Sequence, residues 1–298
     1  MSAQISKAAS LLHKCLAVFA AVRIDTLLVL LLAQLLTVRY ILAPENTWLE
    51  HLSNANLLML ILAILLVVAA GYVINNFYDA EKDKINRPQK YLVGQGVSPA
   101  FQLFIYGVFN ALALLFAFIV SARTLPFFGS YIFGIWLYSH VLKKTFWASN
   151  LFASLLAIIP FFALSLYFQN FSLLVLNHAA FLFLVILIRD LIKDLKNFRG
   201  DYVRKYSTTA VQFGLKATKW IITALIGLTY IPIYFLLTKE RTLGAMHYYF
   251  EGSILFLFVV LILLWLSQTQ KMYLWMHNLL KLLIIAGVLS IILVRYPA

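Results

Sequence analysis

The hydrophobic residues of this chain gather in runs of about 17–23, and short polar segments separate the runs. A helix of that length spans the hydrocarbon core of a bilayer, which is roughly 30 Å thick. A helix formed by such a run would be apolar on all its faces, so periodicity is not informative. We therefore assign each transmembrane helix from the length of its run. The pattern predicts nine transmembrane helices, at residues 24–42, 55–77, 99–121, 126–142, 151–168, 174–189, 218–238, 252–269 and 277–294.

The composition excludes an ordinary soluble domain. Hydrophobic residues make up 63% of the 298 residues and charged residues 12%, whereas soluble domains have about 45–50% and about 25%. The polar segments between the runs are too short to separate two domains. We therefore expect one all-α transmembrane domain over residues 1–298, a single bundle of about nine helices. Residues 1–22 are expected to form an amphipathic lead-in on the membrane surface.

The formal net charge of +13 reflects where the Lys and Arg residues lie along the chain. Segments on the same side of the membrane as the N-terminus carry 18 of them, opposite segments carry five, and Lys281 lies within the last run. The positive-inside rule then puts the N-terminus in the cytoplasm, in an inner or cytoplasmic membrane. Because topology accounts for the charge, nucleic acid is not an expected partner. The single cysteine, Cys15, excludes an internal disulfide and indicates no metal site.

Six of the 11 carboxylates lie at two predicted cytoplasmic helix ends, where the positive-inside rule gives no reason for them. They are Asp79, Glu81, Asp83, Asp190, Asp194 and Asp201. Asp79 with Asp83, and Asp190 with Asp194, are four residues apart. Each pair therefore shares one face of its helix, provided that the helix continues past the lipid boundary. Like charges at this spacing repel, so a positive partner is expected for each pair.

Two kinds of positive partner fit this pattern. Neighbouring lysines would form solvated ion pairs that contribute little stability; they are Lys82, Lys84, Lys193 and Lys196. A divalent ion is the alternative, since magnesium takes oxygen ligands and commonly joins one or two carboxylates to a substrate phosphate. Two acid pairs facing one another across a cavity would hold magnesium ions, with a diphosphate as the natural bridge.

The acidic residues resemble the two signatures of the UbiA superfamily of intramembrane prenyltransferases. The first signature, N-x-x-x-D-x-x-x-D, is matched by Asn75, Asp79 and Asp83 in NNFYDAEKD. The second, D-x-x-x-D with a trailing G-D, is matched by RDLIKDLKNFRGD, which ends at Asp201. The pattern is most similar to the branch of geranylgeranylglycerol-phosphate and digeranylgeranylglycerol-phosphate synthases. Two departures are Asn76 and Asn197, which stand where many members have an acid.

The resemblance implies magnesium-dependent transfer of a polyprenyl group from its diphosphate to a small acceptor inside the membrane. The acceptor would be a glycerol-phosphate-type lipid or an aromatic quinone precursor, and the active site would lie on the cytoplasmic side. The implied metal ligands are Asn75, Asp79, Asp83, Asp190 and Asp194, and the four aspartates are also the expected catalytic residues. Diphosphate contacts are expected from Lys143, Arg87 and Lys193, and acceptor or cation-shielding contacts from Arg23, Tyr72, Tyr138 and Asp201. A charged loop over residues 195–217 is expected to act as a lid.

Two other functions also fit a chain with many spans. A secondary transporter would place ionisable residues in the membrane, although transporters concentrate them near the midplane and not at one face. A non-catalytic membrane homologue is the third interpretation, and Asn76 and Asn197 favour it. Magnesium-dependent consumption of a prenyl diphosphate distinguishes the enzyme from both.

The charge distribution predicts which loops an impermeant thiol reagent reaches. In a Cys15→Ser background, Asn86→Cys and Lys205→Cys should be labelled only from the cytoplasmic side, and Leu243→Cys only from the opposite side, because the positive-inside rule fixes those loops. Labelling of Asn86→Cys and Leu243→Cys from the same side would contradict the nine-helix topology.

Overall fold

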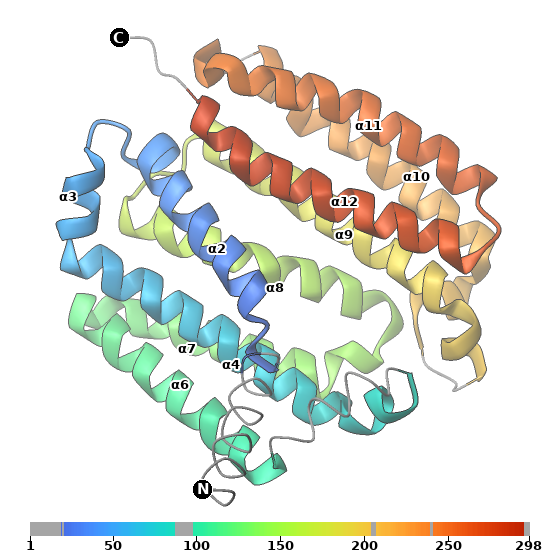
Figure 1. Ribbon diagram of the computed structural model, residues 1–298, viewed down its shortest axis with the longest axis horizontal. Coiled ribbons are helices and arrows are strands. Elements are labelled where there is room, and N and C mark those ends of the chain that lie inside the picture. The colour runs from blue at the N-terminus through green and yellow to red at the C-terminus, as the bar shows by residue number, and fades with distance from the viewer. Residues whose placement is uncertain (1–18, 20, 87–97, 204–206, 239–240, 295–298) are drawn as a thin grey trace, which may run out of the picture. The chain divides into compact units, whose positions relative to one another are not determined.

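The computed structural model describes residues 19, 21–86, 98–203, 207–238 and 241–294 (Figure 1). These residues form helices and connecting turns, without a β-strand among them. The elements are α2 (Ile24–Thr37), the π-helical turn η1 (Val38–Leu42), α3 (Trp48–Ser53), α4 (Ala55–Asn86), α6 (Pro99–Val120), η2 (Ala122–Thr124), α7 (Leu125–His140), η3 (Leu142–Lys144), α8 (Phe146–Tyr167), α9 (Leu173–Val203), α10 (Thr209–Thr238), η4 (Arg241–Met246), α11 (His247–Leu266), α12 (Gln270–Ser290) and η5 (Ile291–Leu293).

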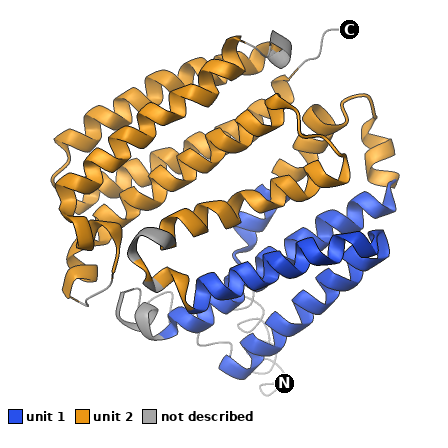
Figure 2. Cartoon of the chain, turned by 180° about the vertical axis from the view of Figure 1, so that it is seen from behind, with its two compact units in different colours: residues 1–31, 54–140 blue, residues 32–53, 141–298 orange. Residues whose placement is uncertain are grey.

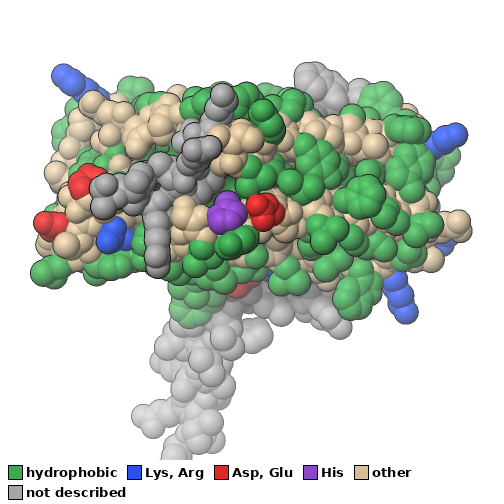
Figure 3. Space-filling view, turned by 90° about the horizontal axis from the view of Figure 1, so that it is seen from above, with side chains coloured by type: hydrophobic (Ala, Val, Ile, Leu, Met, Phe, Trp, Pro, Cys, Tyr) green, Lys and Arg blue, Asp and Glu red, His purple; other side chains and the backbone are tan. Residues whose placement is uncertain are grey.

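The all-α membrane fold predicted from the sequence is confirmed. Eight helical segments within the described ranges are long and apolar enough to cross a membrane. The ninth predicted helix, 126–142, forms α7, which has 16 residues and is shorter than these eight. Hydrophobic side chains are spread widely over the face drawn in Figure 3, and few charged side chains lie among them, as expected for a surface in contact with lipid. The protein is an integral membrane protein, and the cytoplasmic location of its N-terminus remains a prediction.

Two helices extend well beyond the predicted spans. The sequence predicts a span at 174–189 and a loop at 195–217, but α9 continues to Val203 and α10 begins at Thr209. The prediction of a loop at 195–217 is therefore wrong. The fall in hydropathy after residue 189 indicates where the apolar run ends, and the helix does not end there. The helix continues past that boundary by burying Leu191, Ile192 and Leu195.

The described backbone divides into two compact units, coloured separately in Figure 2. Unit 1 comprises Met1–Leu31 and Asn54–His140, and unit 2 comprises Leu32–Ser53 and Val141–Ala298. In unit 1, α4 packs against α6 and α7. Gly71 of α4 allows a close approach, since a Cβ there would lie 3.0 Å from Cγ2 of Ile135 in α7. The single domain expected over residues 1–298 remains a prediction, and the lead-in at 1–22 lies mostly outside the described residues.

In unit 2, the long helix α9 packs against α8, α10 and α12. Helices α10, α11 and α12 also contact one another in sequence order. Hydroxyl groups inside these helices donate to carbonyls one turn earlier, as Thr229 Oγ1 does to Leu225 O at 2.8 Å and Ser253 Oγ to Tyr249 O at 2.7 Å. A polar side chain in hydrocarbon is satisfied in this way without leaving its own helix.

The contact between α11 and α12 depends on a glycine. A Cβ at Gly287 would lie 2.6 Å from the hydroxyl oxygen of Tyr249, which donates to Leu283 O at 3.1 Å. We expect Gly287→Ala to lower the free energy of unfolding by about 1–3 kcal/mol, because the tyrosine must move out of a packed position. Denaturant titration of the purified protein in detergent measures the change.

Gly227→Ala in α10 is the matched control, since nothing lies within 4 Å of its added Cβ. Alanine favours helix over glycine by roughly 1 kcal/mol, so this variant should be neutral or stabilised. Equal stability of the two variants would show that the α11–α12 contact does not need the glycine.

Candidate active site

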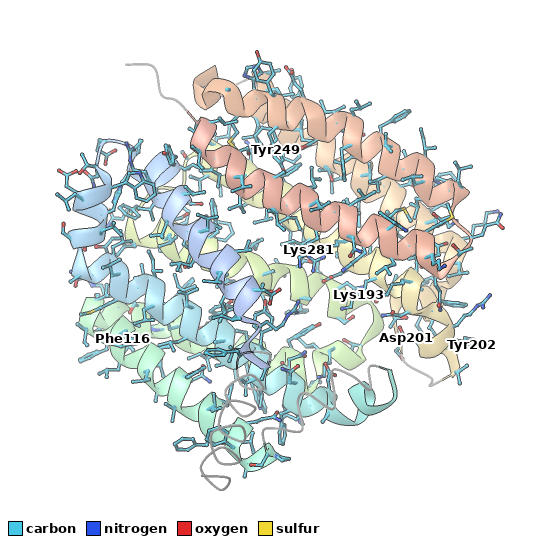
Figure 4. The ribbon with its side chains drawn as sticks, in the orientation of Figure 1. Phe116, Lys193, Asp201, Tyr202, Tyr249 and Lys281 are labelled. Atoms are coloured by element: carbon cyan, nitrogen blue, oxygen red, sulfur yellow. The ribbon has the colours of Figure 1, made fainter. Side chains whose placement is uncertain are left out.

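Helix α9 carries three of the predicted site carboxylates. The helix continues past the apolar run, so Asp190 and Asp194 lie one turn apart on one face, as the spacing predicted. Asp190 is partly exposed, whereas Asp194 is only 8% exposed. Asp201 follows two turns later, still within the helix, and is 4% exposed. Figure 4 labels Asp201 and Tyr202 near the end of α9, and Lys193 earlier on the same helix.

The buried carboxylate of Asp194 has a hydrogen-bond donor from a neighbouring helix. Asn150 in α8 donates from Nδ2 to Oδ2 of Asp194 at 2.7 Å, and a second contact reaches Oγ1 of Thr209 in α10 at 3.4 Å. One amide therefore joins the three helices α8, α9 and α10 at the level of the acid pair. The sequence prediction missed Asn150, because a single asparagine just before an apolar run belongs to no motif.

Helix α4 carries the first acid signature, in unit 1. The helix continues to Asn86, so Asn75, Asp79 and Asp83 occupy successive turns of one helix. Asn75 and Asp79 are partly exposed, and the side chain of Asp83 lies outside the described residues. Helices α4 and α9 belong to different units, so each acid pair is described within its own unit.

Asn76, which stands where many family members have an acid, forms a hydrogen bond within unit 1. Its Nδ2 donates to the backbone carbonyl of Ala21 at 2.9 Å, which ties α4 to the chain just before α2. An aspartate at this position could not donate that bond. The second departure, Asn197, lies partly exposed on α9.

Two further predicted residues come together beside α4. The guanidinium carbon of Arg23 lies 4.9 Å from the centroid of the Tyr72 ring, a cation–π contact. Arg23 has a φ of 54°, in the left-handed region that a non-glycine residue seldom adopts. Such strain gathers at functional sites, and it supports a role for Arg23. The guanidinium of Arg23 therefore occupies one face of the Tyr72 ring.

The remaining predicted residues are spread over both units. Tyr138 lies half-buried near the end of α7 in unit 1, and Lys143 lies partly exposed in η3 of unit 2. Lys193 lies partly exposed on α9, between the two aspartates of the second pair. Arg87 lies outside the described residues. Among the described residues, no group of three or more His, Cys, Asp or Glu side chains is close enough to hold a metal ion.

These features define a polytopic α-helical membrane protein in which helices continue beyond their apolar runs and carry carboxylates there. The sequence model of the UbiA prenyltransferase family matches residues 35–283. The chain belongs to this family and is a prenyltransferase.

Three relatives illustrate the similarity. The digeranylgeranylglyceryl phosphate synthase of Sulfurisphaera tokodaii is 28% identical over 237 residues, which are 75% of this chain and 78% of the relative. A solved structure of a digeranylgeranylglyceryl phosphate synthase has a TM-score of 0.74 and 17% identity, covering 94% of this chain and 97% of that one. A UbiA homologue from Archaeoglobus fulgidus bound to GPP and Mg2+ has a TM-score of 0.67 and 15% identity, covering 93% and 99%. At these identities the structures show a common fold.

The hydrogen bond from Asn150 to Asp194 predicts a measurable loss of stability. Asn150→Ala should lower the free energy of unfolding by about 1–3 kcal/mol, because a buried charged acceptor loses its donor. Asn177→Ala is the matched control: this asparagine on α9 donates only to Leu173 O of its own helix, at 2.9 Å. Thermal unfolding in detergent compares the two variants, and equal losses would indicate that Asp194 does not depend on Asn150.

Proposed function

We propose that this protein transfers a polyprenyl group from its diphosphate to a small acceptor, in a magnesium-dependent reaction on the cytoplasmic side of the membrane. Membership of the UbiA prenyltransferase family supports the reaction class. The observation that carries the residue assignment is the pair of acidic helix segments, Asp79–Asp83 on α4 and Asp190–Asp194 on α9. The GPP bound to the Archaeoglobus fulgidus homologue supports a prenyl diphosphate as donor.

The acceptor is proposed from the relatives. Several relatives of this chain are digeranylgeranylglyceryl phosphate synthases, which favours a glycerol-phosphate-type lipid over an aromatic quinone precursor. A secondary transporter is not favoured, because the family match covers most of the chain.

The residues present fit magnesium by the chemistry of their donors. Asn75, Asp79, Asp190 and Asp194 offer only amide and carboxylate oxygens, the ligands that magnesium takes. Magnesium keeps several waters and binds substrate phosphates, so one or two carboxylates from each helix suffice and a cluster of three acids is not required. When bound, the ion would supply positive charge that stabilises the departing diphosphate.

Each residue of the proposed site then has a defined role. The four aspartates would hold the cation, with Asn75 positioned one turn before the first of them. Asn150 fixes the orientation of Asp194 by occupying one carboxylate oxygen. Lys193, Lys143 and Arg87 are proposed to contact phosphate oxygens as the carbon–oxygen bond to the prenyl group breaks. Arg23 and Asp201 are proposed for the acceptor.

Water must be kept from the allylic carbocation that forms when the diphosphate leaves. The apolar interior of the helices excludes it. Tyr138 is proposed to shield the cation with the face of its ring. Tyr72 is proposed for the same role. The guanidinium of Arg23 occupies the face of the Tyr72 ring in this structure, so Tyr72 would shield the cation only after Arg23 has moved toward an acceptor.

A direct assay tests the proposed function. Purified protein in nanodiscs is incubated with magnesium, labelled geranylgeranyl diphosphate and a panel of glycerol-phosphate lipids and aromatic acids, and products are identified by mass spectrometry. We expect a prenylated glycerol-phosphate lipid, and reversible loss of product on addition of EDTA. Release of diphosphate without magnesium would contradict the metal requirement.

Variants of the acid pairs test the assignment of residues. Asp79→Asn and Asp194→Asn should each lower turnover by at least about 100-fold, because each removes a charge that would bind the cation. Glu251→Gln is the control, since this exposed carboxylate on α11 belongs to neither pair. Full turnover in both aspartate variants, with the wild-type magnesium dependence, would mean that the pairs are only surface charges.

A further inference from the structure

One serine hydroxyl in unit 2 departs from the way in which other hydroxyls in its helices are satisfied. Ser165 in α8 donates from Oγ to Phe161 O at 3.2 Å, one turn earlier. Thr218 in α10 donates from Oγ1 to Gly214 O at 2.9 Å, again one turn earlier. Ser154 also lies in α8 and is 0% exposed, yet its Oγ has no hydrogen-bond partner among the residues that the structure describes. This hydroxyl therefore does not use the carbonyl of the preceding turn.

A buried hydroxyl without a partner is unfavourable. It has lost its hydrogen bonds to water, and apolar side chains around it offer none in return. Nearly all buried polar groups of native proteins are satisfied, so an unsatisfied one requires an explanation, such as a ligand or a water molecule. A serine hydroxyl has one O–H donor and two lone pairs that accept. Ser154 is therefore available to a small polar group that is not part of the described chain.

Ser154 lies one turn from the residue that holds Asp194. Asn150 precedes Ser154 by four residues, so the two side chains share one face of α8, about 6 Å apart along the helix axis. Asn150 donates from Nδ2 to Oδ2 of Asp194 in α9 at 2.7 Å. The span of α8 begins at Ser149, so Ser154 lies further along the apolar run than Asn150 does.

The direction of the helices connects Ser154 with Asp190 as well. Only residues 168–172 join α8 to α9, and the two helices pack against each other, so they run in opposite directions. One turn forward from Asn150 along α8 then corresponds to one turn back from Asp194 along α9, and the residue there is Asp190. The unsatisfied hydroxyl of Ser154 is therefore at about the level of the second acid pair.

We propose that Ser154 binds the acceptor substrate by a hydrogen bond to its hydroxyl group. The prenyl diphosphate carries oxygen only in its anionic head, which is bound best by cationic partners, whereas Ser154 is neutral and lies at the level of two carboxylates. An alcohol has no charge for those carboxylates to repel, and it can donate to the serine hydroxyl or accept from it. The inference rests on the proposed function, to which it adds a residue that recognises the acceptor.

Binding of an acceptor without turnover tests the site. Calorimetric titration of the protein in nanodiscs with a short-chain alkylglycerol phosphate, without prenyl diphosphate, gives the Kd. Ser154→Ala should raise this Kd about 3- to 10-fold, because one hydrogen bond is lost. Ser165→Ala is the matched control and should leave the Kd unchanged, since Ser165 is equally buried in the same helix but is satisfied by Phe161 O. An unchanged Kd in Ser154→Ala would overturn the inference and leave a water molecule as the partner.

A second ligand identifies the group that Ser154 contacts. The analogue in which hydrogen replaces the free hydroxyl of the alkylglycerol phosphate should bind the wild type about 3- to 10-fold more weakly than the parent ligand does. Ser154→Ala should bind the two ligands equally, because either change removes the same hydrogen bond and the two losses do not add. Losses that add in full would show that the ligand hydroxyl contacts another residue, which would overturn the inference.

Thermal unfolding separates loss of binding from loss of structure. Ser154→Ala removes an unsatisfied group, so it should be at least as stable as the wild type. A clear loss of stability would show that the hydroxyl has a partner within the protein, contrary to the inference.

Steady-state kinetics connect the site with the reaction. Ser154→Ala should raise the KM of a glycerol-phosphate acceptor about 3- to 10-fold and leave the KM of the prenyl diphosphate unchanged. A selective rise in the KM of the prenyl diphosphate would overturn the assignment to the acceptor. If the wild type transfers no prenyl group at all, the proposed function fails, and the comparison of the two ligands still decides whether Ser154 recognises the hydroxyl.

Discussion

Hydrocarbon offers no hydrogen bonds, and the described structure follows from that one constraint. Every long apolar run of the chain is helical, because a helix satisfies its own backbone N–H and C=O groups. Several hydroxyl groups inside the spans, such as those of Thr229 and Ser253, donate to carbonyls of the preceding turn. A side chain that cannot be satisfied locally needs a partner from another helix, and such partners determine where polar chemistry is possible in this protein.

Helix α9 shows how one element serves both environments. Its first half is an apolar run suited to lipid, and its second half carries Asp190, Asp194 and Asp201. A prenyl diphosphate has the same two-part character, with an apolar chain joined to a charged head. Under the proposed function, the acidic segment of α9 would provide carboxylates where the charged head of such a substrate meets its apolar tail.

Burial makes the second half of α9 dependent on its neighbours. Asp194 is 8% exposed and receives the N–H of Asn150 from α8. A buried carboxylate without a donor would be costly, so this contact also fixes the rotation of α9 against α8 and α10.

The sequence by itself determined the class of fold and the position of each acid pair on its helix. Run length fixed the helical spans, and a spacing of four placed Asp79 with Asp83 and Asp190 with Asp194 on successive turns, because helical geometry is local. Hydropathy could not reveal that α9 continues to Val203, since burial against other helices replaces lipid there. Only the tertiary structure decided that Asn150 meets Asp194, that Asn76 meets Ala21 and that His277 brings α12 to the level of Arg189. These pairs are 44, 55 and 88 residues apart, and no local periodicity encodes which helices become neighbours.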